Sequence, residues 1–244
     1  MSESLVVNEI YISLQGESTF AGLPCIFVRL TGCDLRCSYC DTVYAFSEGR
    51  RMSLNEIKSE ICEKAGSFQQ GRGAQRLPLI EVTGGEPLLQ KAVLPLMRDL
   101  CDEGLTVLIE TSGAHEIGKI DPRVRRIVDL KCPSSGEMDR NRFSILEDLR
   151  ATDEVKFVIG TREDYQWAKD HIREFRLDQR CPVLMSWVSP LRDDQRDASL
   201  KTIPAGQSPM SRQDLAECIV EDALPVRFQL QMHKYIWSPD QKGV

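Results

Sequence analysis

The sequence lacks several features that mark whole classes of protein. No apolar run approaches the ~20 residues that a membrane-spanning helix needs, so we expect no membrane anchor. The N-terminal stretch has neither a basic flank nor a long apolar segment, which argues against a secretory signal peptide. A basic excess is also missing: 37 acidic residues stand against 31 basic ones, a net charge of −6 that disfavours a broad grip on nucleic acid.

The composition is that of a globular protein with a core of its own. Apolar residues make up 41% of the 244 residues and charged residues 28%, which excludes a disordered tail and a fibrous repeat. A chain of this length buries roughly 70–75% of the surface that its unfolded form exposes, so it needs no disulfides to hold a core. The sequence shows no internal boundary, and we expect a single domain over residues 1–244.

The cysteines divide into a scattered set and a tight group. The total of nine is odd, which without a secretory signal disfavours a disulfide framework and indicates a reducing, cytoplasmic location. Six are scattered and are expected to pack as small buried hydrophobes. The other three, Cys33, Cys37 and Cys40, form a Cys-x-x-x-Cys-x-x-Cys pattern. This group is therefore the first candidate for chemistry.

Short apolar runs alternate with segments of helical pattern. The expected strands cover 5–12, 26–30, 79–83, 106–110, 127–130, 155–159, 183–187 and 227–231, and the expected helices cover 53–65, 88–103, 165–175 and 211–224. This alternation predicts an α/β fold with a mostly parallel sheet, in the form of a partial or modified (β/α) barrel, whose functional groups gather at the carboxyl ends of the strands. Residues 66–76 and 189–210 read as loops, and the second is long enough for a lid, an insertion or a disordered segment.

The three clustered cysteines admit several kinds of site. A structural zinc ion takes four ligands, usually as two Cys or His pairs, and the nearest histidine in sequence, His115, is far down the chain. A ferredoxin-type cluster takes four thiolates, so three would leave one iron open to a ligand with amino and carboxylate groups. A remote fourth zinc ligand and plain packing of the thiols stay open as alternatives.

The cysteine pattern resembles the signature of the radical S-adenosylmethionine (SAM) superfamily. Residues 33–40 read Cys-Asp-Leu-Arg-Cys-Ser-Tyr-Cys, with the aromatic Tyr39 before the last cysteine, as is common in that superfamily. The resemblance implies that the thiolates hold a [4Fe-4S] cluster and that SAM binds its fourth iron. Reduction would then cleave SAM to a 5′-deoxyadenosyl radical.

Three further segments resemble the parts of that superfamily that contact SAM. Residues 83–87 (Thr-Gly-Gly-Glu-Pro), 110–113 (Glu-Thr-Ser-Gly) and 129–136 (Asp-Leu-Lys-Cys-Pro-Ser-Ser-Gly) each lie at the end of a predicted strand. Glycines at a strand end let a ligand approach the backbone closely. Each segment alone also fits a turn or a helix cap, but their order along the chain fits the superfamily.

Other motifs narrow the resemblance to one family. Residues 14–17 read Leu-Gln-Gly-Glu, Arg29 precedes the cysteines, Asp-Thr follows them at 41–42, and 229–237 read Gln-Leu-Gln-Met-His-Lys-Tyr-Ile-Trp. From about 8 to 237 the chain is similar to the 7-carboxy-7-deazaguanine synthase family. This implies a radical SAM lyase of queuosine and 7-deazapurine biosynthesis that converts 6-carboxy-5,6,7,8-tetrahydropterin to 7-carboxy-7-deazaguanine. Hydrogen abstraction at C6 would lead to ring contraction and loss of ammonia, with SAM regenerated.

The same resemblance implies roles for individual residues. The cluster ligands would be Cys33, Cys37 and Cys40, and Thr42 would bind Mg²⁺, an ion that takes few protein ligands. The residues expected to contact SAM are Tyr39, Asp41, Gly85, Glu86, Cys132, Pro133 and Ser134. Those expected to contact the substrate are Leu14, Gln15, Gly16, Arg29, Thr83 and His233. A guanidinium such as that of Arg29 suits a substrate carboxylate because it binds in a bidentate manner.

Simpler explanations exist for three of these residues. Arg29 also fits half of an ion pair, His233 a structural residue in a strand-like run, and Thr42 a turn residue. The run 185–188 (Met-Ser-Trp-Val) stands where the family often has Gln-Pro near the SAM adenine. Residues 238–244 extend past the point where many members end.

The family also implies the cofactors and partners: a [4Fe-4S] cluster, SAM, Mg²⁺, a small pterin substrate, an external one-electron reductant such as flavodoxin, and a second copy in a homodimer, with no nucleic acid or membrane. Three other functions compete. An activating enzyme for a glycyl-radical protein would need a groove for its protein partner. A non-enzymatic iron–sulfur redox module would be indifferent to SAM, and a zinc-binding interaction protein would hold no iron at all.

Overall fold

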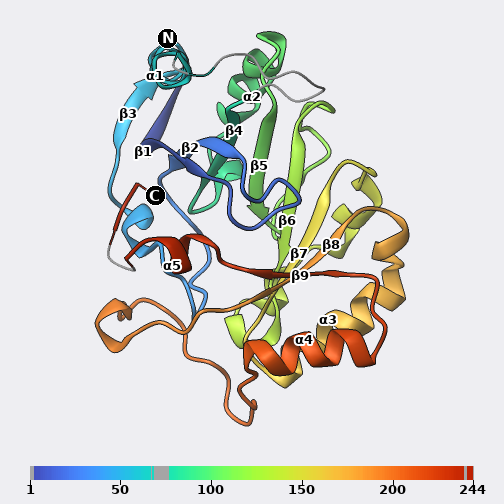
Figure 1. Cartoon of the computed structure of the whole chain (residues 1–244). Coiled ribbons are helices and arrows are strands. Elements are labelled where there is room, and N and C mark those ends of the chain that lie inside the picture. The colour runs from blue at the N-terminus through green and yellow to red at the C-terminus, as the bar shows by residue number, and fades with distance from the viewer. Residues whose placement is uncertain (1–2, 67, 69–76, 239–240, 244) are drawn as a thin grey trace.

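One nine-stranded sheet organises the molecule (Figure 1). The computed structural model describes residues 3–66, 68, 77–238 and 241–243. The strands are β1 (Ser4–Leu14), β2 (Pro24–Leu30), β3 (Arg50–Ser53), β4 (Leu79–Gly84), β5 (Val107–Ser112), β6 (Arg125–Leu130), β7 (Glu154–Ile159), β8 (Val183–Trp187) and β9 (Arg227–Leu230). Their order is β3-β1-β2-β4-β5-β6-β7-β8-β9, and the edge strands β3 and β9 do not pair, so the barrel is partial.

Strand direction confirms the predicted fold class. Each neighbouring pair from β2 and β4 across to β8 and β9 is parallel. Strands β1 and β3 add an antiparallel edge beside β2. The molecule is therefore an α/β protein with an open, mostly parallel sheet, and its parallel strands all end at the same edge.

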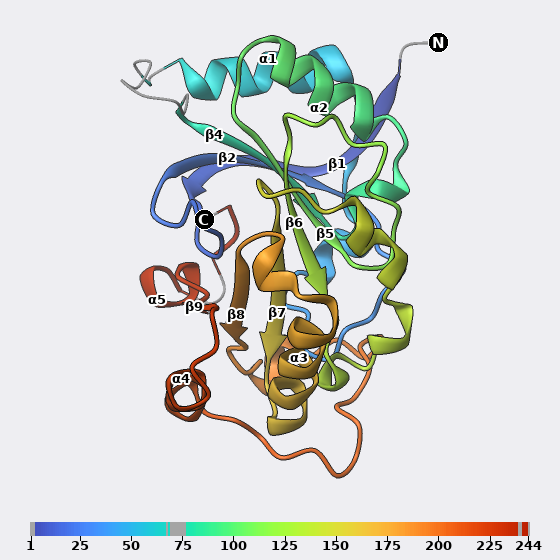
Figure 2. The ribbon, with the colours of Figure 1, turned by 90° about the vertical axis from the view of Figure 1, so that its right-hand side faces the viewer.

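Helices pack against the sheet (Figure 2). They are α1 (Leu54–Ala65), α2 (Val93–Asp102), α3 (Arg162–Phe175), α4 (Arg212–Glu221) and the short α5 (His233–Ile236). Helix α1 contacts β1 to β3, α2 contacts β5, and α3 contacts β7. Ser53 and Glu56 form a capping box at the start of α1, as the sequence predicts, and α3 and α4 begin in the same way. In the described part of the chain no helix is long and apolar enough to cross a membrane.

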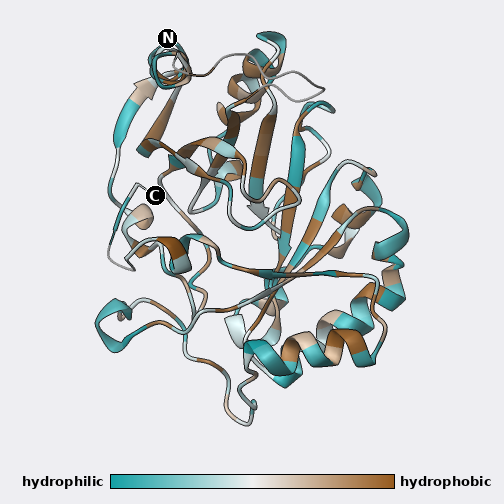
Figure 3. Cartoon of the chain, in the orientation of Figure 1, coloured by the Kyte–Doolittle hydropathy of each residue, from teal (hydrophilic) through white to brown (hydrophobic). Residues whose placement is uncertain are grey.

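The strands carry the apolar core (Figure 3). Strand β7 buries all six of its residues, and β4 buries all but its last, which is the pattern of parallel strands covered on both faces. Three buried charged residues break this pattern: Glu154 at the first position of β7, and two within the strands, Glu81 in β4 and Lys156 in β7. Because a buried charge must be paired or hydrogen-bonded, these two positions point to a site inside the sheet.

Several elements differ from the sequence predictions. The predicted helix 88–103 is broken into a 3₁₀ turn, Pro87–Leu89, and α2, with Pro95 in the first turn, where no backbone N–H is needed. Strand β3 was missed because its polar residues carry no apolar pattern. The strand-like run around His233 forms the helix α5 instead. The loop expected at 66–76 lies, apart from residues 66 and 68, outside the described residues.

Candidate active site

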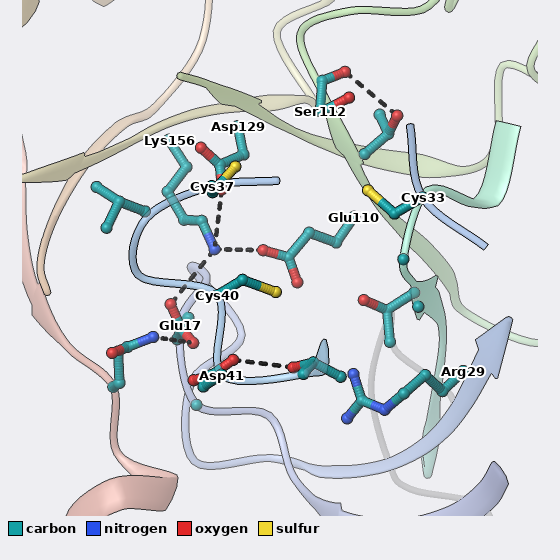
Figure 4. Close-up of a pocket in the computed structure, with 18 of the residues that line it drawn as sticks. Glu17, Arg29, Cys33, Cys37, Cys40, Asp41, Glu110, Ser112, Asp129 and Lys156 are labelled. Atoms are coloured by element: carbon teal, nitrogen blue, oxygen red, sulfur yellow. Dashed lines mark hydrogen bonds and ion pairs between the residues drawn. The ribbon is translucent and has the colours of Figure 1, made fainter. Parts of the chain in front are cut away.

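A cavity of about 240 Å³ opens at the carboxyl ends of the strands (Figure 4). Eight strands, β1, β2 and β4 to β9, contribute to its wall directly or through the residue that follows the strand. Alternate residues of a strand face the same side, so Glu81 and Thr83 of β4, and Lys156 and Val158 of β7, reach the cavity together. The loop that carries the cysteines and the chain around α5 close the remaining sides.

The three clustered cysteines all line this cavity. They lie in the loop that follows β2, and none of the three forms a disulfide. Burial raises the pKa of Cys37 to about 11 and that of Cys40 to about 12, and it raises the pKa of Cys33 as well. Within the described residues, no three His, Cys, Asp or Glu side chains are placed to bind one metal ion, and the three thiols stand apart around the cavity in Figure 4.

The glycine pair at the end of β4, Gly84 and Gly85, holds the start of the cysteine loop. Gly85 N–H donates to the carbonyl of Leu30 at 3.1 Å, and Glu86 N–H donates to the carbonyl of Gly32 at 2.8 Å. A Cβ on Gly85 would lie 2.2 Å from the carbonyl oxygen of Gly32 and 2.8 Å from Cβ of Cys33. A side chain at this position would thus displace the cysteine loop, which gives a physical reason for the Gly-Gly sequence at the strand end.

The cavity also fits a polar ligand beside the cysteines. The hydroxyl of Tyr39 and Oδ1 of Asp129 are buried and have no hydrogen-bond partner in the described structure, although both residues line the cavity. Buried polar atoms are nearly always hydrogen-bonded, so these two indicate a missing polar partner. In a [4Fe-4S] cluster each thiolate binds its own iron, so the three thiols need not converge on one point. SAM bound beside such a cluster would supply the polar partner that Tyr39 and Asp129 lack.

The remaining residues expected to touch SAM fall into two groups. Asp41 and Gly85 line the cavity, and Asp41 pairs with Lys234 at 2.7 Å. Burial alone would raise the pKa of Asp41, but Lys234 outweighs burial and lowers the pKa well below its usual range. Those that do not line the cavity are Glu86, Cys132, Pro133 and Ser134.

These four residues instead hold the framework of the site. The buried carboxylate of Glu86 accepts hydrogen bonds from Thr111 Oγ1 and from both Ser112 N and Ser112 Oγ, which ties the end of β4 to the end of β5. Cys132 packs in the core, and Pro133 opens the 3₁₀ turn Pro133–Ser135. The carbonyl of Ser134 accepts a hydrogen bond from Ser38 Oγ at 2.6 Å. Their contact with SAM stays a prediction.

All six residues expected to contact the substrate line the cavity: Leu14, Gln15, Gly16, Arg29, Thr83 and His233. The ion-pair explanation for Arg29 also holds, because its Nε donates to Glu9 Oε1 at 2.8 Å while its Nη2 donates to the Tyr11 hydroxyl at 2.6 Å. These partners fix the guanidinium at the cavity wall, so pairing and substrate binding do not exclude each other.

A charged network that the sequence analysis missed lies in the same cavity. The ammonium of Lys156 donates to Glu110 Oε1, lies 3.3 Å from Glu17 Oε2 and lies 3.9 Å from Asp129 Oδ2. Figure 4 shows the three carboxylates around this one lysine. Sheet register places Lys156 directly beside Asp129. The signal in the sequence was a single lysine in an otherwise apolar strand.

Charge pairing sets the ionisation of this network. Burial would lower the pKa of Lys156, but Glu110 and Glu17 outweigh it and raise that pKa well above its ordinary value. Burial would raise the pKa of Glu17, but Lys156 and then His233 bring it below its ordinary value. The outcome is a buried ammonium on Lys156 held beside an ionised Glu17.

Glu81 behaves in the opposite way. Burial, followed by repulsion from Glu110, raises its pKa from 4.5 to about 8, although Gln15 Nε2 donates to its carboxylate at 3.1 Å. The folded protein thus holds a proton on Glu81 that the unfolded chain gives up above about pH 4.5.

We therefore expect Glu81 to make stability fall as pH rises. Between pH 4.5 and about 8 the folded state binds one proton more than the unfolded state, so the free energy of unfolding loses up to about 1.4 kcal/mol per pH unit through this group. Glu81→Gln removes the titration and should flatten the curve. Urea unfolding of both proteins from pH 5 to pH 9 measures the difference, and curves that run parallel throughout would contradict the assignment.

Comparison with solved structures identifies the class of this fold. Escherichia coli QueE aligns with a TM-score of 0.66 over 93% of this chain and 94% of that chain, at 23% identity. Streptococcus suis SuiB bound to S-adenosylmethionine aligns with a TM-score of 0.53 over 81% of this chain and 48% of that chain, at 15% identity. No protein-family model matches the chain. These likenesses show that the open, mostly parallel sheet is a fold shared with QueE and SuiB.

Curated relatives give the family. Over 240 residues the chain is 44% identical to the 7-carboxy-7-deazaguanine synthase of Koribacter versatilis, covering 98% of this chain and 99% of the relative. Identity to that of Chlorobaculum tepidum is 40% over 243 residues, covering 98% and 97%. The chain belongs to the 7-carboxy-7-deazaguanine synthase family, which confirms the recognition made from the motifs.

Proposed function

We propose that this protein converts 6-carboxy-5,6,7,8-tetrahydropterin to 7-carboxy-7-deazaguanine and ammonia. The observation that carries the proposal is the 44% identity, over nearly the full length of both chains, to a 7-carboxy-7-deazaguanine synthase. Product and ammonia together contain the same atoms as the substrate, so the reaction needs no net oxidant. The protein is thus an enzyme that rearranges a small molecule.

Cys33, Cys37 and Cys40 would hold a [4Fe-4S] cluster at the edge of the cavity, with SAM between the cluster and the substrate. When bound, these groups supply the 5′-deoxyadenosyl radical that takes hydrogen from C6 of the pterin. The buried Tyr39 hydroxyl and Asp129 Oδ1 offer SAM a donor and an acceptor that no described residue satisfies.

The wall formed by Gln15, Glu81 and Arg29 would bind the pterin. Gln15 and Glu81 offer an amide and a carboxyl to the polar edge of the ring. Arg29, fixed by Glu9 and Tyr11, presents a guanidinium suited to the substrate carboxylate. Tyr11 in turn stacks on Phe27 with ring centroids 5.0 Å apart, so the tyrosine that holds this arginine is itself fixed by packing.

Lys156 is the residue that we assign to proton transfer. Release of ammonia requires a proton on the leaving nitrogen and a base to take a proton from carbon. The ammonium of Lys156 and the carboxylate of Glu110 form such an acid–base pair inside the cavity, in direct contact. Glu110, followed by Glu17 and Asp129, raises the pKa of Lys156 and so keeps the lysine protonated before the reaction.

Thr42 is the residue that we propose as the ligand of Mg²⁺. Its hydroxyl lines the cavity and donates to Asp41 Oδ1 at 2.8 Å, so an oxygen donor and a carboxylate stand together. We expect Thr42→Ala to keep the cluster but to raise the Mg²⁺ concentration for half-maximal turnover roughly 10-fold or more, since a lost ligand or its supporting contact typically costs that much. Turnover measured against Mg²⁺ concentration, with iron content as the control, decides the point, and an unchanged Mg²⁺ response would remove Thr42 from the site.

The partners of the enzyme form a further part of the proposal. The reaction begins with one electron from outside the chain, which a carrier such as flavodoxin would deliver. We also propose that the whole chain, 1–244, acts as one catalytic domain, that two copies form a homodimer and that the enzyme works in the cytoplasm. Size-exclusion chromatography with light scattering tests the dimer directly.

The substrate assignment is tested by a strictly anaerobic reaction of the reconstituted protein with SAM, Mg²⁺, dithionite and 6-carboxytetrahydropterin. We expect mass spectrometry to find 7-carboxy-7-deazaguanine. Cleavage of SAM with an unchanged pterin would contradict the substrate and favour an activating enzyme of the same cluster type. An intact cluster that leaves SAM uncleaved would indicate a redox module instead.

A further inference from the structure

The long loop 189–210, drawn in orange in Figure 1, returns to the cysteine loop. Apart from one 3₁₀ turn, Asp193–Gln195, and a single bridge at Pro209, it has no regular structure. Its contact with the cysteine loop is made at Lys201, whose backbone N–H donates to the carbonyl of Arg36 at 2.9 Å. Arg36 lies between two of the cysteines, directly before Cys37.

A second segment of the chain, at Glu137, binds the backbone N–H of Arg36. Glu137, which is 4% exposed, accepts a hydrogen bond from the backbone N–H of Arg36 at 2.7 Å through Oε1. Its Oε2 accepts from Nζ of Lys201 at 2.9 Å, and that ammonium also donates to the carbonyl of Gly136 at 2.7 Å.

These contacts form a closed ring. The N–H and the carbonyl of Arg36 are each held from outside the cysteine loop, and the two residues that hold them, Glu137 and Lys201, are joined to each other. We name these three residues the Arg36 clamp. A buried carboxylate that loses its cation is costly, so Lys201 stabilises Glu137 in the position that holds the loop.

We propose that Glu137 and Lys201 are positioning residues of the cluster site: the clamp fixes the spacing of the cysteines and sets the charge next to the cluster. The long loop is then part of the cofactor site, rather than a lid over the substrate. The inference rests on the proposed function only in that the cysteines hold an iron–sulfur cluster.

Two single substitutions break the clamp with opposite changes of charge. Lys201→Met removes a positive charge and leaves the carboxylate of Glu137 unpaired, whereas Glu137→Gln removes the negative charge and keeps an acceptor oxygen for Arg36 N–H. Local net charge is one of the factors that set the potential of an iron–sulfur cluster, because negative charge stabilises the oxidised form. The double variant restores the wild-type charge without restoring the ion pair.

The test measures the reduction potential of the cluster and the rate at which a chelator removes its iron, both anaerobically and without pterin. We expect Lys201→Met to lower the potential and Glu137→Gln to raise it, with the double variant near wild type. Both single variants should lose iron roughly 10–100-fold faster, the usual cost of losing an outer partner of a metal ligand. Arg196→Met, an exposed position on the same loop, is the matched control and should match wild type.

Wild-type potentials and iron loss in both single variants would overturn the inference. Shifts of the same sign in both would also overturn it, because they would reflect a general loosening of the structure. Glu137→Ala, which removes the acceptor altogether, provides a further variant and should lose iron faster than Glu137→Gln. Since none of these measurements uses the pterin, a wrong substrate assignment leaves them unaffected.

Discussion

Cys37→Ala is expected to abolish both the cluster and turnover. Cys37 is 8% exposed, lines the cavity and stands between the other two cysteines of the motif in sequence. The remaining six cysteines of the chain do not line the cavity, so none replaces its thiol. A cluster left with two protein thiolates loses the anchoring that this fold provides. Iron analysis and the visible absorption spectrum after anaerobic reconstitution measure the first effect, and product formation measures the second.

Cys62→Ala is the matched control for this prediction. Cys62 is exposed on α1 and takes no part in the cavity, so its replacement should leave iron content and turnover unchanged. Activity retained in the Cys37 variant after verified reconstitution would remove the three-cysteine cluster from the mechanism.

Lys156→Met is expected to lower both the stability of the protein and its turnover, through the loss of a buried charge and not through the loss of the cluster. The substitution removes the ammonium that stands among Glu17, Glu110 and Asp129. Because breaking a buried ion pair leaves charge uncompensated, we expect a loss of about 3 kcal/mol in the free energy of unfolding. Loss of the proposed proton donor should also slow product formation by roughly 10²–10⁴-fold. Urea unfolding and single-turnover kinetics measure the two effects separately.

A charge-balanced variant separates stability from catalysis. Lys156→Met combined with Glu110→Gln removes one charge of each sign, so stability should recover while product formation stays low. Lys169→Met is the control: this lysine forms an ion pair with Asp222 at 2.6 Å outside the cavity. It should keep full turnover. Wild-type turnover in the Lys156 variants would contradict the proton-transfer role, and unimpaired SAM cleavage with no product would support it.

Local patterns in the sequence predicted much of the fold. The apolar runs located eight of the nine strands of the described sheet. The pattern is clearest in β4 and β7, since parallel strands covered on both faces carry few polar residues. Strand β3 escaped because an exposed edge strand keeps no apolar pattern, and its pairing with β1 depends on contacts distant in sequence. The predicted helix 88–103 does not break at its proline: Pro95 fits the first turn of α2, and the chain breaks earlier.

The candidate site was predictable where a motif lies in one stretch of chain. The cysteines, the glycine pair and residues 14–16 are short continuous patterns, and all reach the cavity. The network around Lys156 was not predictable in this way, because its members come from three separate strands and from the segment after β1, and they meet only in the folded sheet. The Arg36 clamp joins residues more than sixty positions apart in the same manner.

The most direct test of the account follows deuterium from C6 of the substrate. The cavity brings the three thiols and the proposed pterin wall together, so the radical chemistry and the rearrangement should share this one space. With 6-carboxytetrahydropterin deuterated at C6, we predict deuterium in the recovered SAM and 5′-deoxyadenosine while 7-carboxy-7-deazaguanine forms. Product that forms while the deuterium is released only to water would contradict the account.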